Sequence, residues 1–230
     1  RPAWLAVDRI WRLAATISLA MADAAEEAAG LPDRVVRLKW PNDLVIAVDA
    51  AGRAVESSSG SLDEPPRSAS TSEGTEPGPS LRKLGGVLGE STGLGTDDPQ
   101  VVVGIGVNAD WPAAEFPPEI TTTMTSLRAA GGERPVDPAM LLDAFTSRLE
   151  ARIEALHGGR FDVADWVERQ VTTGRRVDIV LPDGAIETVL ARGVDAASGA
   201  LRIAAPTPDD PDAERHVHVG EIRRVRLAAV

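Results

Sequence analysis

The sequence contains no cysteine and no long hydrophobic run, and each absence excludes a class of protein. Without cysteine, neither a disulfide-stabilised scaffold nor a cysteine-ligated metal site is possible. The longest apolar runs, such as residues 44–48, are far shorter than the roughly 18–20 residues of a membrane-spanning helix. A chain of 230 residues is nevertheless long enough to bury a core, as one large or two smaller domains.

Positive charge is also scarce, and almost all of it is arginine. The 24 basic residues include only two lysines, Lys39 and Lys83, and the 35 acidic residues bring the net charge to −11. Such a chain repels phosphate backbones, so we expect neither DNA nor a membrane as its partner, whereas a small anion needs only a local site. No secretory signal is recognisable, so we expect a cytoplasmic protein. Residue 1 is arginine and not methionine, which leaves two alternatives open: a fragment of a longer protein or a natural truncation.

The first part of the chain alternates between helical and strand patterns. Apolar residues recur at helical spacing over residues 4–29, and Gly30 and Pro32 end that pattern. Asp137 and Pro138 are a good cap and first turn for a helix that ends at Gly158. A short helix is expected over 162–170. Strands are predicted over residues 35–38, 44–48, 83–90 and 100–107.

Residues 49–80 differ in composition from everything around them. They contain eight serines, four prolines, six acidic residues and two arginines, with too little apolar surface to offset the entropy of ordering. We therefore predict a disordered insertion at a turn between two strands.

The last 60 residues carry only strand patterns. Strands are predicted over 176–181, 185–192, 201–205, 216–219 and 222–227, with a Pro-Asp-Gly turn after the first. We therefore predict a mixed α/β domain over residues 1–170 and a small β-barrel or sandwich over 171–230.

Three segments carry residues suited to ligand binding. Lys39, Asn42 and Asp43 combine a cation, an amide and a carboxylate that could hold Mg²⁺, although a surface turn would have the same composition. Lys83 precedes a glycine pair, so its ammonium group and nearby backbone N–H groups could meet one anion, or it could be a solvated lysine at a strand start. Residues 104–109 fit a loose dinucleotide pattern, but the prolines that follow cannot begin the required helix. A closely packed glycine-rich strand is the alternative there.

Taken together and in this order, the three segments resemble the central block of the biotin protein ligases. They are Lys-Trp-Pro-Asn-Asp-Leu, Lys-Leu-Gly-Gly-Val-Leu-Gly-Glu and Val-Val-Val-Gly-Ile-Gly-Val-Asn. The resemblance implies an α+β fold, with a mixed sheet and helices of the biotin/lipoate ligase type, followed by a small SH3-like β-barrel. It also implies formation of biotinyl-5'-AMP from biotin and MgATP, and transfer of biotin to a lysine of a carboxyl-carrier domain of a carboxylase.

The resemblance further implies a role for individual residues. Lys83 would be the catalytic residue and would bind biotin, stabilising charge in the transition state. The remaining assignments are Gly86 and Gly104 to the biotin pocket, Lys39, Asn42, Asp43, Asn108 and Arg175 to ATP, and Asp43 to Mg²⁺.

One departure from the family pattern concerns the start of the chain. The family's first core segment, with a Gly/Arg-rich loop that covers biotinyl-AMP, has no counterpart in these 230 residues. We therefore expect little ligase activity from this chain alone. The alternatives are a non-catalytic protein that only binds a partner and a lipoate–protein ligase of the same superfamily.

Overall fold

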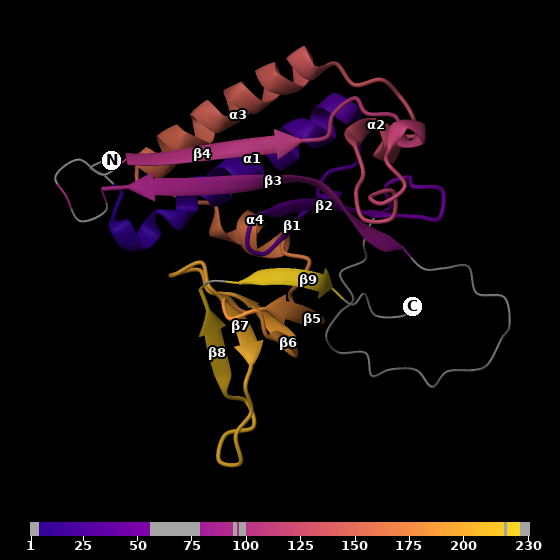
Figure 1. Cartoon of the computed structure of the whole chain (residues 1–230). Coiled ribbons are helices and arrows are strands. Elements are labelled where there is room, and N and C mark those ends of the chain that lie inside the picture. The colour runs from indigo at the N-terminus through magenta and orange to yellow at the C-terminus, as the bar shows by residue number, and fades with distance from the viewer. Residues whose placement is uncertain (1–4, 56–78, 94–95, 97–99, 219, 226–230) are drawn as a thin grey trace, which may run out of the picture.

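The computed structural model describes residues 5–55, 79–93, 96, 100–218 and 220–225. Its elements, in chain order, are η1 (Val7–Arg9), α1 (Trp11–Ala29), β1 (Val36–Lys39), β2 (Asp43–Val48), β3 (Ser80–Thr92), β4 (Gln100–Val107), η2 (Ala113–Glu115), α2 (Leu127–Ala130), α3 (Pro138–His157), α4 (Val163–Glu168), β5 (Arg175–Val180), β6 (Ile186–Val194), β7 (Leu201–Ala204), β8 (Glu214–Val217) and β9 (Glu221–Val225). The strands form two antiparallel sheets, ordered β1-β2-β3-β4 and β8-β7-β6-β5-β9 (Figure 1). The predicted α+β class is confirmed.

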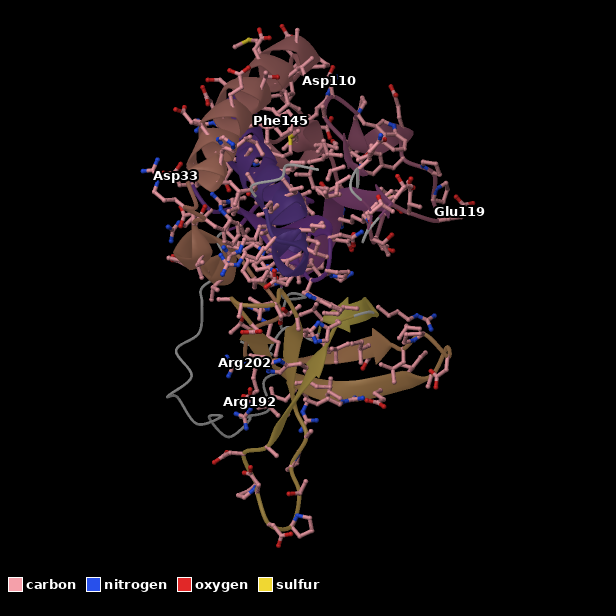
Figure 2. The ribbon with its side chains drawn as sticks, turned by 90° about the vertical axis from the view of Figure 1, so that its left-hand side faces the viewer. Asp33, Asp110, Glu119, Phe145, Arg192 and Arg202 are labelled. Atoms are coloured by element: carbon pink, nitrogen blue, oxygen red, sulfur yellow. The ribbon has the colours of Figure 1, made fainter. Side chains whose placement is uncertain are left out.

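The two long helices cover one face of the first sheet. α1 contacts β1, β3 and β4, and α3 packs on α1. Figure 2 shows α3, α1 and the first sheet as successive layers, with the second sheet beneath them. None of the helices in the described ranges is long and apolar enough to cross a bilayer.

α1 is buried on more sides than its sequence pattern predicted. Met21 and Ala25 of the predicted apolar stripe are buried, but Leu13 and Ile17 are only partly covered. The wider burial arises because α1 lies between α3 and the sheet, and its many alanines allow close approach on both sides. The helix ends at Gly30 as predicted, with a left-handed φ of 58° and an N–H that donates to the Glu27 carbonyl.

α3 begins and ends where the sequence indicated. The Asp137 side chain accepts from the Ala139 N–H at 2.8 Å, Pro138 occupies the first turn, and Gly158 is the C-cap. Leu141 and Leu156 are buried against the core. Leu142, which also belongs to the predicted apolar face, is 60% exposed.

The predicted insertion over residues 49–80 is too long at both ends. The Ala54 N–H donates to the Ala130 carbonyl at 3.0 Å, and the Val55 N–H donates to the Ala47 carbonyl at 2.9 Å. β3 already begins at Ser80, opposite Val48. Backbone pairing of these polar residues overrides their composition. Residues 56–78 lie outside the described part of the chain.

The second sheet contains all five strands predicted after residue 170. β5 lies between β6 and β9, while β8 and β9 form the two edges. Within the described residues the sheet is therefore open and not a closed barrel. β8 begins and ends two residues earlier than predicted, and residues 226 and 227 of the last predicted strand lie outside the described part. At the predicted boundary of 170–174 the chain pairs with β1. The Leu38 N–H donates to the Arg169 carbonyl, and the Val171 N–H donates to the Leu38 carbonyl.

A buried arginine fastens β1 to the helices. Arg169 is 3% exposed and donates to Glu26 at 2.8 Å, to Asp23 at 2.7 Å and to the carbonyl of Val36 at 2.7 Å. It also pairs with Asp165 at 3.2 Å. Burial alone would lower the pKa of Arg169, but the hydrogen bond and charge of Glu26, with the other carboxylates, raise it above its usual value. This cluster fixes the strand that carries Lys39.

Candidate functional site

Both lysines of the chain bind one carboxylate at the end of the first sheet. Lys83 Nζ lies 2.5 Å from Asp43 Oδ1, and Lys39 Nζ lies 3.0 Å from Asp43 Oδ2. The side chains of Asp43 and Lys39 are 13% and 17% exposed, whereas that of Lys83 is 44% exposed. Two cations against one anion leave an excess of positive charge, and Lys83 is the cation most open to a ligand.

Strand pairing brings these residues together. Lys39 lies opposite Asp43 across the hairpin of β1 and β2, whose turn contains a cis peptide bond between Trp40 and Pro41. On the other side of β2, Lys83 lies opposite Val45, beyond a bulge at Leu44 and Val45. Because directly opposed residues share a face of a sheet, the two lysines reach Asp43 from its two neighbouring strands.

Gly86 lies directly beside this group of charges. It lies opposite Asp43, and a Cβ at this position would be 3.5 Å from Lys83 Nζ and 3.6 Å from Asp43 Oδ1. The carbonyl of Asn42 accepts from the Val87 N–H at 2.8 Å, while the Asn42 side chain is exposed. The structure therefore brings together five predicted site residues: Lys39, Asn42, Asp43, Lys83 and Gly86.

The glycines of β4 continue the same face but make few contacts. Gly106 lies opposite Gly86, and Gly104 lies opposite Leu88, which is 61% exposed. A Cβ at Gly104 would meet only a carbonyl at 4.0 Å, and one at Gly106 would meet nothing within 4 Å. The close backbone packing considered for this strand occurs instead at Gly85, where a Cβ would lie 2.3 Å from the Gly106 carbonyl oxygen. After β4 the chain enters the short η2 turn, so the helix of a dinucleotide site does not follow.

Asn108 has a fixed position beside the Lys83 backbone. Its side-chain amide donates to the Thr125 carbonyl at 3.0 Å, and its N–H donates to the Leu84 carbonyl at 3.0 Å. Thr125 in turn donates to the Lys83 carbonyl at 2.9 Å. The side-chain amide of Asn108 thus helps to hold Thr125 against β3.

Arg175 begins β5 in the second sheet and is not part of the lysine group. Its neighbour is Arg37, a residue that the sequence did not single out, on the same face of β1 as Lys39. Burial, then the charge of Arg175, lowers the pKa of Arg37, and burial also lowers the pKa of Arg175. Arg37 donates to the Glu168 carbonyl at 2.8 Å. In the sequence, the alternation Arg37-Leu38-Lys39 places two cations on the same face of a strand, and this pattern indicates a cationic face.

The tryptophans mostly form the core. Trp166 is buried, and its ring centroid lies 4.7 Å from that of Trp11, as expected for core residues. Trp40 is also buried and donates its indole N–H to the Gly199 carbonyl at 3.1 Å. These three rings line a cavity of about 180 Å³, which is also lined by Lys39, Asn42 and Asp43. Trp111 packs edge-on against Phe116.

The residues present do not fit a protein-held Mg²⁺ at Asp43. Both of its carboxylate oxygens lie within 3.0 Å of lysine ammonium groups, which occupy the positions a cation would take. No group of three or more His, Cys, Asp or Glu residues suited to a metal occurs in the ranges that the structure describes.

Comparison with known proteins agrees with this arrangement. Residues 6–108 match the model of the biotin/lipoate A/B protein ligase family. The similarity to that family thus extends over residues 6–108, which are fewer than half of the 230 residues. A biotin–[acetyl-CoA-carboxylase] ligase of Mycobacterium tuberculosis is 27% identical over 184 residues, which are 80% of this chain and 53% of that protein. The chain therefore spans about half the length of the curated relative it matches.

Solved structures of family members share the fold. The biotin protein ligase from Aquifex aeolicus in complex with biotin and ATP is 20% identical, with a TM-score of 0.63 over 94% of this chain and 72% of that chain. Another crystal structure of the Aquifex aeolicus enzyme gives a TM-score of 0.65 at 19% identity, over 95% of this chain and 77% of that one. The biotin-ligase fold predicted from the sequence is thereby confirmed, since both sheets are included in these alignments.

Proposed function

We propose that this chain is the part of a biotin–protein ligase that holds the charges of biotin and ATP during adenylation. The observation that carries the proposal is the pair of lysines on Asp43, of which Lys83 is 44% exposed, within the matched family segment. The reactants are a carboxylate and a polyphosphate, so their negative charges repel each other as they approach. An excess of fixed positive charge at the meeting point lowers that cost.

In the first step, a carboxylate oxygen of biotin bonds to the α-phosphorus of ATP. The bond from that phosphorus to the bridging oxygen breaks, and pyrophosphate leaves with the electron pair. Lys83 is the more exposed ammonium group and would contact the biotin carboxylate and the α-phosphate. Lys39 and the exposed Asn42 would contact the other phosphates.

In the second step, the amine of a carrier lysine bonds to the acyl carbon of biotinyl-AMP. The acyl–oxygen bond breaks, AMP leaves, and the amine loses a proton. Gly86 and Gly104 would form the floor beneath biotin, because neither carries a side chain above the sheet. Asn108 and Arg175 would lie on the nucleotide side. Arg37, close enough to Arg175 for their charges to interact, would add a second cation there. ATP would arrive as MgATP, and Asp43 would not bind its Mg²⁺.

We also propose that residues 171–230 form a separate SH3-like domain that follows the catalytic domain of residues 1–170. Five consecutive antiparallel strands support this proposal. The donation from Trp40 to Gly199 would fasten this domain to the turn that carries Asn42 and Asp43. A biotin carboxyl-carrier domain would be the protein partner.

The test is formation of the acyl-adenylate by the complete reading frame that contains this chain. Purified protein is incubated with ATP, Mg²⁺ and either biotin or lipoic acid, and the adenylate is measured by chromatography. We expect biotinyl-AMP and no lipoyl-AMP. The family description also covers lipoate ligases, so formation of lipoyl-AMP alone would identify the substrate as lipoate and not biotin. If neither adenylate forms, the non-catalytic binding protein is the alternative that stays.

A further inference from the structure

Asp43 contacts the chain's two lysines through different oxygens. Oδ1 lies against Lys83 and Oδ2 lies against Lys39, at 2.5 and 3.0 Å. Lysine has a long flexible side chain with a compact charge, and by itself it does not hold that charge at one place. A short aspartate on a paired strand does, since its backbone is bonded to strands on both sides.

The geometry gives the two ammonium groups a common direction. Both must reach the same carboxylate, so they lie on the sheet face that carries Gly86, where the Lys83 side chain is 44% exposed. Without the carboxylate, two like charges this close would repel and separate. Asp43 thus permits a local charge density that neither lysine could maintain alone.

We propose that Asp43 is a positioning residue that aims Lys39 and Lys83 at one anionic ligand, and that it is not a metal ligand. The proposal rests on the proposed function, in which these two ammonium groups receive the biotin carboxylate and the phosphates. A dication on Asp43 would have to displace both lysines from their partner, and would remove the arrangement that the site requires.

The test uses the two-lysine composition of the chain. Protein labelled with ¹³C-lysine gives Cε–Hε signals from Lys39 and Lys83 only, and Lys39→Arg assigns them. A lysine held in one geometry has two inequivalent Hε protons, whereas a freely rotating one has a single averaged signal. In the ligand-free protein we expect inequivalent protons for both lysines. Asp43→Asn should average both pairs, and Asp43→Glu should preserve the inequivalence of at least one.

Asp49→Asn is the matched control. Asp49 also follows β2 but accepts from the Arg53 N–H and contacts neither lysine, so its replacement should leave both lysine signals unchanged. If the lysine signals of wild type are already averaged, or survive Asp43→Asn, the positioning role is wrong.

A second arm examines the metal. Mn²⁺ broadens signals of nuclei close to it, so one equivalent of Mn²⁺ without nucleotide should leave both lysine signals sharp. Broadening of both in wild type, abolished by Asp43→Asn, would make Asp43 a metal ligand. Neither arm uses biotin or ATP, so these spectra can fail while adenylation succeeds, and the reverse.

Discussion

Two ion-pair clusters of this molecule have opposite compositions. Around Arg169, one buried guanidinium meets the carboxylates of Asp23, Glu26 and Asp165. Around Asp43, one carboxylate meets two ammonium groups, and the outer one, Lys83, is 44% exposed. The first cluster is enclosed, and its arginine has a partner for each of its side-chain nitrogens. The second leaves positive charge at the surface.

The contrast separates two uses of the same interaction. A buried arginine with several partners connects α1, α4 and β1, and losing it would strand carboxylates in the interior. The partly exposed Lys83 adds little to folding because water screens its pair with Asp43, but it retains attraction for an anion. Mutations should therefore affect stability at the first cluster and ligand chemistry at the second.

The largest effect on stability should come from Arg169→Met. Removing the guanidinium leaves the buried carboxylate of Glu26 without its cation, which should cost about 3–5 kcal/mol of unfolding free energy. Denaturant titration measures this value. Arg148→Met is the control, because Arg148 pairs with Glu27 at an exposed position and should cost about 1 kcal/mol or less. Equal losses in the two variants would remove the distinction between enclosed and exposed pairs.

At the other cluster, Lys83→Ala should affect chemistry instead of folding. In the complete reading frame, we expect biotinyl-AMP formation to fall by about 10²–10³-fold with an unchanged melting temperature, the usual cost of one lost transition-state contact. Lys83→Arg should recover little, because a planar guanidinium does not replace a compact ammonium. A wild-type rate for the alanine variant would exclude Lys83 from the reaction.

Gly86→Ala tests whether the ligand lies over Gly86. Its Cβ would lie in ordinary contact with Lys83 Nζ and Asp43, so the fold should survive while the space for ligand shrinks. We expect biotin or ATP affinity to fall by about tenfold, or about 1.4 kcal/mol. In Gly89→Ala, on the same strand, the Cβ meets nothing within 4 Å and binding should not change. Calorimetric titration of both variants decides, and an equal effect would place the ligand elsewhere.

The smallest effect should follow replacement of residues 56–78 by a Gly-Asn turn. Val48 bridges to Ala54 and pairs with Ser80, so the two ends are close, and loop length changes the closure entropy slowly. We expect the melting temperature to stay within about 3 °C. Removing residues 49–78 should cost more, because the bond from Ala54 to Ala130 is lost. A large drop in the shorter deletion would show that 56–78 contributes to the fold.

Local signals made much of the fold predictable. Asp137 with Pro138 begins α3 and Gly30 ends α1, because caps and left-handed glycines act on their own backbone neighbours. What could not be predicted depends on pairing across the chain. Residues 49–55 read as polar insertion, yet their backbone bonds to Ala47 and Ala130 hold them in place.

The candidate site shows the same limit. The residue types of the segments around Lys39 and Lys83 indicated anion binding, but only the register of β1, β2 and β3 places both lysines on Asp43. The sequence therefore suggested Asp43 as a metal ligand, whereas its oxygens face ammonium groups. Arg169 belongs to no motif, and its role follows from contacts with distant residues.

The most direct measurement is the rate of biotin-dependent ATP–pyrophosphate exchange by Asp43→Asn in the complete reading frame, followed as Mg²⁺ is raised. If Asp43 aims the two lysines, the rate should fall by at least about tenfold and excess Mg²⁺ should not restore it, while the melting temperature changes little. Full recovery at high Mg²⁺ would make Asp43 a metal ligand, and an unchanged rate with a lowered melting temperature would make it a structural turn residue. Either result would contradict the role of the lysine pair described above.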